Sequence, residues 1–259
     1  MKTSRGPGRV TLPRALSKLG LSSRSQALRL IEEGLVSVNK SVEKNPHRWV
    51  DLDHDRIEVS NRLVKRSAFR YILLNKPNGF VTTSSDERGQ RTVFDVLGPA
   101  GKGLSAAGRL DKESTGLLLF TDDNQLANTL TSPGSDLLKT YVVNLDRPIA
   151  GKDLLHLGHG VDIEINGAVH RTKSASVSQT TPGTVEIGIT EGKNRQVRRM
   201  MSALGYEVLA LRRIALGPLK LGELQEGQFR DLTAEEVKAL KGGRKPVVVK
   251  KKPRSMKRR

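Results

Sequence analysis

The chain has 259 residues, enough for one large domain and a small one, and carries 45 basic against 27 acidic side chains, a formal net charge of +18. It contains no cysteine, which excludes disulfides, thiolate zinc sites and cysteine nucleophiles. No apolar run reaches the roughly 18 residues that a membrane-spanning helix needs, so we expect a cytoplasmic protein with no membrane partner.

The positive charge lies at the two ends of the chain. Residues 1–29 hold 7 basic side chains and no acid, and residues 244–259 hold 9 and no acid. Residues 30–243 hold the other 29 basic and 27 acidic side chains, a net charge of only +2. Clustered Lys and Arg displace counterions from phosphates, so this asymmetry favours a polyanionic partner. For the tail alone, a solubilising charge run is an equally good interpretation.

The first part of the chain is predicted to form a loose arm at residues 1–10, followed by two short helices and a small β-ribbon. Three leucines recur at helical spacing between residues 12 and 19, and a second helix is predicted from Ser25 to Glu33. The apolar runs at 35–38 and 56–59 alternate as strands do.

The segments Leu16–Ala27 and Ile31–Asn39 resemble the S4 RNA-binding domain, whose second helix exposes a basic face to RNA. The resemblance predicts an S4-like RNA-binding domain at residues 1–60. Three cations with no acid between them are its candidate RNA contacts: Lys18, Arg24 and Arg29. Solvated positions on amphipathic helices are the alternative interpretation.

After a polar linker predicted at 61–70, strands and helices follow without a regular βαβ rhythm. A strand at 71–74 ends in a strong turn signal, Asn75-Lys76-Pro77-Asn78-Gly79. Further strands are predicted near 115–121, 140–145, 161–165, 173–178 and 184–190, and helices near 124–131 and 194–204. The pattern indicates an α+β domain with a sizeable sheet at 71–242, and we expect a disordered basic tail at 243–259.

One carboxylate stands between two cations in Gly108-Arg109-Leu110-Asp111-Lys112, a turn that enters an apolar strand. Arg109 and Lys112 favour the ionised carboxylate of Asp111, ready as a nucleophile or charge stabiliser. The strand would anchor the turn on a rigid scaffold. The alternative is that Asp111 is a capping or solvated residue, as most acids in exposed turns are.

Three arginines follow a Gly/Asn turn in residues 191–201. Arg195, Arg198 and Arg199 fall at i, i+3 and i+4, so a helix starting near residue 194 would place them on one face. Guanidinium groups this close repel unless an anion lies opposite, and no acid falls between residues 192 and 206. An RNA phosphate or a site carboxylate is the expected partner, with a solvated basic face as the alternative.

A tyrosine in a predicted strand, Lys139-Thr140-Tyr141, is the third candidate. Such a ring is usually part of the core. It could also stack on a nucleobase, an interaction that contributes about 1–3 kcal/mol.

These motifs, with Leu73–Pro77 ahead of them, resemble in order and spacing those of RNA pseudouridine synthases, specifically the S4-containing family that acts on ribosomal RNA. The resemblance covers about residues 12–240. It implies an α+β fold with a small N-terminal S4-like domain and a catalytic domain built on a mostly antiparallel mixed sheet flanked by helices. The active cleft would cross the middle of that sheet.

The resemblance also implies roles for individual residues. Asp111 would be the catalytic aspartate, Tyr141 the ring that stacks on the target uracil, and Arg198 the cation that pairs with the aspartate. Arg109 would help to fill the space left by the flipped nucleotide, and Lys76 would support the cleft. Arg109 and Lys76 are also candidate RNA contacts, as are Arg195 and Arg199. The run Lys112–Thr115 departs mildly from the usual family pattern without touching Arg109 or Asp111.

The implied reaction is the site-specific isomerisation of uridine to pseudouridine in ribosomal RNA, with a flipped uridine and an aspartate nucleophile. Isomerisation changes neither mass nor redox state, so we expect no cofactor, no metal and no nucleotide. The expected partner is a structured hairpin or an assembling ribosomal subunit, and the chain is expected to be a monomer.

Other interpretations remain open. A non-catalytic RNA-binding ribosome-assembly factor would also explain the basic ends and the S4-like segment. A metal-dependent nuclease using Asp122 and Asp123 is disfavoured, because adjacent acids point to opposite faces of a strand. His156 and His159 could form a metal pair, but they have no matched third ligand and are predicted to lie in a loop.

Overall fold

The computed structural model describes residues 9–19, 21–22, 24–52, 54–63, 68–83, 89–132 and 134–242. Most of the predicted N-terminal arm, part of the predicted linker and the predicted disordered tail lie outside these residues. Among the described residues, no helix has the length and apolar character needed to cross a membrane.

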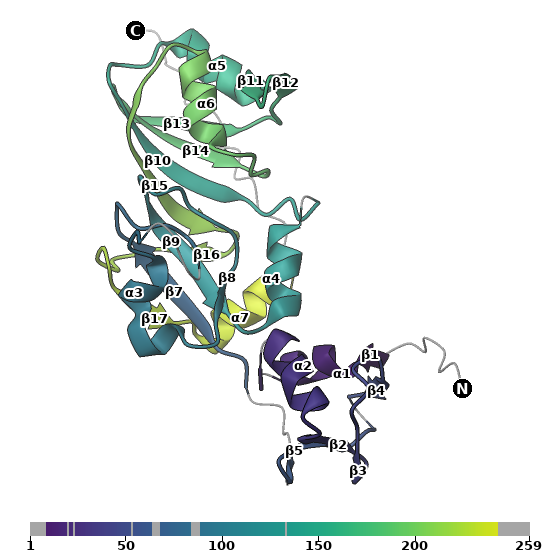
Figure 1. The fold of residues 1–259 in the computed structure, drawn as a ribbon. Helices are drawn as coiled ribbons and strands as arrows, with labels where there is room; N and C mark the ends of the chain where they lie inside the picture. The colour runs from purple at the N-terminus through teal and green to yellow at the C-terminus, as the bar shows by residue number, and fades with distance from the viewer. Residues whose placement is uncertain are drawn as a thin grey trace, which may run out of the picture.

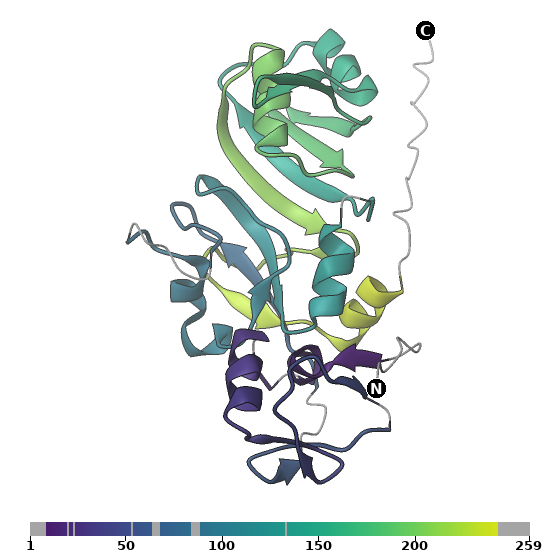
Figure 2. The same cartoon turned by 45° about the vertical axis from the view of Figure 1, so that its right-hand side comes forward.

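The N-terminal unit packs two helices beside short strands at one end of the molecule (Figures 1 and 2). Helices α1 (Leu12–Lys18) and α2 (Arg24–Glu32) confirm the helical pattern, since Leu12, Leu16, Ala27 and Ile31 are fully buried in this unit's own core. The strands form two small sheets, one pairing β1 (Arg9–Thr11) with β4 (Trp49–Asp51) and one in the order β3 (Ser41–Val42), β2 (Val36–Val38), β5 (Ile57–Val59), β6 (Arg62–Leu63).

A long mixed sheet organises the rest of the chain. Its strands follow the order β13 (Ser176–Thr181), β14 (Thr184–Ile189), β10 (Lys139–Leu145), β15 (Val208–Leu216), β9 (Ser114–Thr121), β7 (Tyr71–Lys76) and β17 (Phe229–Asp231). Two short strands extend it, β8 (Ser105–Ala106) beside β9 and β16 (Leu219–Lys220) beside β15. Within the described part of this sheet, β9 and β15 pair in parallel and the other pairs are antiparallel. The predicted α+β class and mostly antiparallel mixed sheet are therefore confirmed.

Helices cover both faces of the sheet, so its central strands are apolar on both sides. On β7, Ile72 and Leu74 pack in one core and Leu73 in the other, and the residues of β9 divide in the same way. The first core includes side chains of α3 (Val93–Leu97), α5 (Gly151–His159) and α6 (Gln196–Ala203), and the second includes side chains of α4 (Asn124–Thr131) and α7 (Ala234–Lys241). A ribbon of β11 (Asp162–Ile165) and β12 (Ala168–Arg171) lies beside α6.

Strand β15 joins the two halves of the sheet, running from the β10–β14 half to the β7–β9 half (Figure 1). The backbones meet at Gly116, whose φ is +101°. A Cβ atom there would lie 2.2 Å from the carbonyl oxygen of Arg213. Only glycine permits this approach, and it places the turn that precedes β9 against the middle of the sheet.

Two expectations need correction. His156 and His159 do not lie in a loop but in the last turn of α5, which ends at Gly160 with φ +92°. Strand β15 was not predicted, because Arg212 and Arg213 interrupt its apolar pattern.

Candidate functional site

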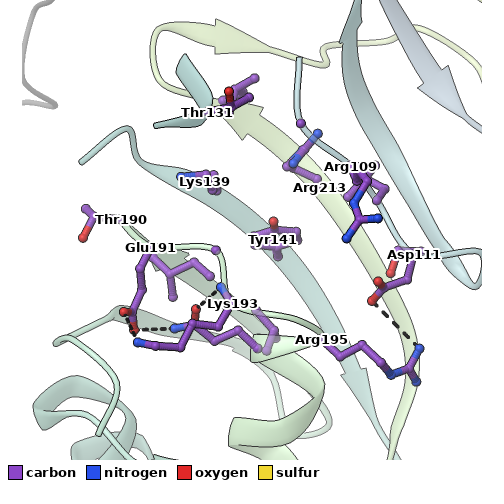
Figure 3. Close-up of a pocket in the computed structure, with 18 of the residues that line it drawn as sticks. Arg109, Asp111, Thr131, Lys139, Tyr141, Thr190, Glu191, Lys193, Arg195 and Arg213 are labelled. Carbon is purple, nitrogen blue, oxygen red and sulfur yellow. Dashed lines mark hydrogen bonds and ion pairs between the residues drawn. The ribbon is translucent and has the colours of Figure 1, made fainter. Parts of the chain in front are cut away.

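A cleft of about 480 Å³ crosses the middle of the large sheet, a size in the range of ligand pockets. It is lined by the turn before β9, by β10 and β15, and by the loop between β14 and α6. Figure 3 shows Asp111 and Arg195 on one side of this cleft, Tyr141 on its floor, and Lys139 and Thr190 on the other side. Segments far apart in the sequence therefore meet in one site.

Asp111 lies half-exposed at the rim of the cleft, in the turn between the buried Leu110 and β9. Two hydrogen bonds shape this turn: Ser114 N donates to Asp111 O at 3.0 Å, and Thr82 Oγ1 donates to Leu110 O at 2.8 Å. The turn presents a carboxylate from a well-fixed backbone, as the sequence predicted.

Lys76 lies under this turn and is completely buried. Its ammonium donates to the carbonyl oxygens of Pro77, Lys112 and Ser114 at 3.0, 3.1 and 2.7 Å. Burial lowers the pKa of Lys76 to about 8, against the opposing effect of Asp111, Glu113 and Glu226. This burial contradicts the direct RNA contact predicted for Lys76, whereas its three hydrogen bonds agree with the predicted role in supporting the cleft.

Among the described residues, Arg195 is the cation that approaches the carboxylate of Asp111 within ion-pair distance. Its Nη1 lies 3.9 Å from Asp111 Oδ2 and 2.8 Å from Glu113 Oε2. The hydrogen bond between Arg195 and Glu113 raises the pKa of Arg195 and lowers that of Glu113. Arg195 takes this position because its backbone is left-handed, with φ +51°, just before α6 begins at Gln196.

The other two arginines bind backbone carbonyl oxygens and make no ion pair with Asp111 among the described residues. Arg198 donates to the carbonyl oxygens of Val208 at 3.0 Å and Glu113 at 3.3 Å, and Arg199 donates to those of Glu164 and Asn194. The pairing expected between Arg198 and Asp111 is therefore replaced in this structure by Arg195. Because Arg195 precedes the helix, the three guanidinium groups do not form a single basic face.

Tyr141 is 8% exposed and lines the cleft from β10. Its partner across the strands is Arg213 of β15, a residue that the sequence reasoning missed. Arg213 is 3% exposed, and its Nε donates to Leu117 O at 2.7 Å. Arg109 is exposed and also lines the cleft.

Glu191, Lys193 and Gln196 brace the loop before α6. Glu191 accepts hydrogen bonds from Lys193 Nζ and Gln196 Nε2, both at 2.6 Å, and from Lys173 N at 2.8 Å. Burial acts to raise the pKa of Glu191, but the bonds from Lys193, the Lys173 backbone and Gln196 hold it below its ordinary value. This carboxylate is thus engaged by the protein itself.

The candidate RNA contacts of the N-terminal unit lie apart from the residues that line the cleft. Arg24 and Arg29 are exposed on α2, and Lys18 is half-exposed at the end of α1. Their binding to RNA remains a prediction.

The structure does not support the alternative metal sites. Asp122 accepts from Arg70 N at 2.8 Å, and Asp123 accepts from Tyr71 Oη at 2.8 Å and caps α4. Within the described ranges, no group of three His, Cys, Asp or Glu side chains is arranged to hold a metal ion.

Comparison with known proteins matches both units of the chain. A family model described as RNA pseudouridylate synthase matches residues 70–203, and an S4 domain model matches residues 10–57. A crystal structure of a pseudouridylate synthase is similar with a TM-score of 0.65 at 33% identity, over 89% of this chain and 99% of that chain.

Curated relatives match over nearly their whole length. An uncharacterised RNA pseudouridine synthase of Bacillus subtilis is 36% identical over 236 residues, which cover 89% of this chain and 98% of the relative. The ribosomal large subunit pseudouridine synthase B of Bacillus subtilis is 36% identical, over 89% of this chain and 95% of its own. The ribosomal small subunit pseudouridine synthase A of Salmonella typhimurium is 36% identical, over 85% and 94%.

Proposed function

Because the chain belongs to the RNA pseudouridylate synthase family and is an RNA pseudouridine synthase, we propose that it converts specific uridines of ribosomal RNA to pseudouridine at the cleft around Asp111. It does so on a flipped uridine, with Asp111 as the nucleophile and without a cofactor. The relatives that act on ribosomal subunits support ribosomal RNA as the substrate class.

The observation that carries the proposal is the arrangement of Asp111, Tyr141 and Arg195 around one cleft. The carboxylate stands at the rim, the ring lies on the floor, and the guanidinium lies 3.9 Å from the carboxylate. A uridine whose base stacks on Tyr141 could bring its ribose to Asp111. The nucleotide must leave its helix to enter, because its glycosidic bond is inaccessible in a stack.

The reaction can be written with the residues of this cleft. The carboxylate of Asp111 attacks ribose C1′ as the C1′–N1 bond breaks, and the electron pair of that bond leaves with the base. The freed uracil rotates on Tyr141, and its C5 then bonds to C1′, displacing the carboxylate. The proton on C5 goes to solvent and N1 gains one, so atoms and electrons balance. A single carboxylate suffices, because the leaving group is recaptured and no water is activated.

The supporting residues have separate tasks. Arg195 balances the negative charge of Asp111 and of a nearby phosphate, and Arg198 fixes the backbone at Glu113. Lys76 fixes the turn from below. Arg109, exposed at the cleft, fills the space that the flipped nucleotide leaves. Residues 1–60 form the S4-like RNA-binding domain, with Lys18, Arg24 and Arg29 as contacts, and residues 71–242 form the catalytic domain. The chain acts as a cytoplasmic monomer.

The experiment that tests this function measures the product. Unmodified small- and large-subunit ribosomal RNA transcripts are incubated with the full chain, digested to nucleosides and separated by chromatography. We expect pseudouridine to appear in one RNA as uridine is lost in equal amount, with or without a chelator. Tight binding of both RNAs with no pseudouridine would favour the assembly factor, and chelator-sensitive chain cleavage would favour the nuclease.

A further inference from the structure

Beside Tyr141, the cleft contains a second pair of cations, Lys139 and Arg213, that the reaction itself does not use. Lys139 and Tyr141 are two residues apart on β10, so their side chains share one face of the sheet. Tyr141 stands directly opposite Arg213 on β15, which puts Arg213 on the same face. Lys139 and Arg213 therefore flank the aromatic floor, and both line the cleft.

Protein groups leave these two cations incompletely satisfied. Arg213 uses Nε for Leu117 O, while its Nη2 is buried with no hydrogen-bond partner among the described residues. A buried donor without a partner costs about 1–3 kcal/mol, which a ligand can recover. Lys139 is half-buried and donates to Leu137 O at 2.9 Å, a single bond among the described residues for an ammonium with three donors.

Neither carboxylate that lines the cleft neutralises these cations by direct contact. Asp111 lies beside Arg195, and Glu191 is bonded to Lys193, Gln196 and the Lys173 backbone. Burial lowers the pKa of Lys139, as does the charge of Arg213, while Asp136 and Glu191 act in the opposite direction. Two neighbouring cations in a partly desolvated cleft favour an anion between them.

We propose that Lys139 and Arg213 form a phosphate subsite that binds a backbone phosphodiester of the RNA next to the flipped uridine. This inference rests on the proposed function, because it deepens the use of the same cleft. A phosphate held between Lys139 and Arg213, beside the ring of Tyr141, would fix the strand while the base rotates on the ring. Phosphate contacts of this kind set register and orientation.

The test compares Lys139→Gln and Arg213→Gln with Lys152→Gln, a control at an exposed lysine of α5 outside the cleft. Binding to unmodified ribosomal RNA transcripts is measured over a series of salt concentrations. We expect each cleft variant to reduce the slope of log K against log salt by about 0.7–0.9, the loss of one phosphate contact. KM should rise with kcat retained, and Lys139→Arg should restore binding. The control variant should match the wild type.

Several results would overturn the subsite. An unchanged salt slope in folded Lys139→Gln would do so, and this variant decides the matter if Arg213→Gln does not fold. A fall in kcat with KM and slope unchanged would show that the residues act on the base or on Asp111 instead. Calorimetry with inorganic phosphate provides a further arm: binding of free phosphate that needs Lys139, with RNA affinity independent of it, would contradict an RNA phosphodiester. If the wild type makes no pseudouridine, the proposed reaction fails, yet the salt slopes still report whether the subsite exists.

Discussion

Replacing Lys76 with methionine tests whether a buried ammonium holds the catalytic turn. In the folded protein, the pKa of Lys76 is lowered from 10.5 to about 8, chiefly by burial. In the unfolded chain this lysine keeps its ordinary value, so between these two pH values the unfolded state binds one more proton. Stability must therefore rise with pH over this range. A shift in the pKa of Lys76 from 10.5 to about 8 corresponds to a gain of about 3 kcal/mol in the free energy of unfolding across this range.

The assay is urea unfolding of the full wild-type chain and of Lys76→Met at several values from pH 7 to pH 10.5. Other groups titrate in both proteins, so the informative quantity is the difference between their free energies of unfolding. We expect this difference to be constant below pH 8 and then to change by about 3 kcal/mol in favour of the wild type as the pH rises to 10.5. A difference that stays constant throughout would refute the reasoning, because Lys76 would then titrate like an exposed lysine.

Three further substitutions test other parts of the structure. Gly116→Ala should lower the free energy of unfolding by more than about 3 kcal/mol, because strain at positive φ adds to a Cβ placed 2.2 Å from Arg213 O; chemical denaturation would measure this, and near-wild-type stability would exclude the close approach. Tyr71→Phe should cost about 1 kcal/mol by removing the buried hydrogen bond to Asp123, with activity unchanged; a loss of activity in a stable variant would contradict a purely structural role. Glu113→Gln should leave Asp111 as the remaining ionised partner of Arg195, so the loss of unfolding free energy caused by Arg195→Gln should depend more strongly on salt in this background than in the wild type. A double-mutant cycle of unfolding free energies measures this coupling, and additive effects would show that Glu113 and Arg195 are not coupled.

Local sequence patterns predicted the parts of the site that depend on near neighbours. The turn at Asp111 follows from a cation-flanked acid entering an apolar strand, and Tyr141 lies in a strand as expected. Burial of both α1 and α2 on one apolar side follows from helical spacing. These features need no information about distant segments.

The rest depends on pairings between distant segments. The contact between β10 and β15 joins residues 139–145 to 208–216, so nothing near Arg213 in the sequence indicates that it lies beside Tyr141. The prediction that three arginines share one helix face failed at Arg195, because Arg195 itself has a left-handed backbone and lies just before the helix. Lys76 is a charged residue in a strand whose six residues are all buried, and its three carbonyl partners come from a turn almost 40 residues away and from its own neighbour. The apolar run Tyr71–Leu74 just before it was the feature of the sequence that indicated a buried strand.

Tritium release from ribosomal RNA labelled at uracil C5 tests the central claim most directly, because forming the C5–C1′ bond expels that hydrogen. The measurement compares the wild type, Asp111→Asn and the matched control Asp122→Asn, with RNA binding recorded for each. We predict release from the wild type and the control, and none from Asp111→Asn although it still binds RNA. Release by Asp111→Asn at the wild-type rate would contradict the assignment of Asp111 as the nucleophile, and a variant that loses binding together with release would show that Asp111 is structural.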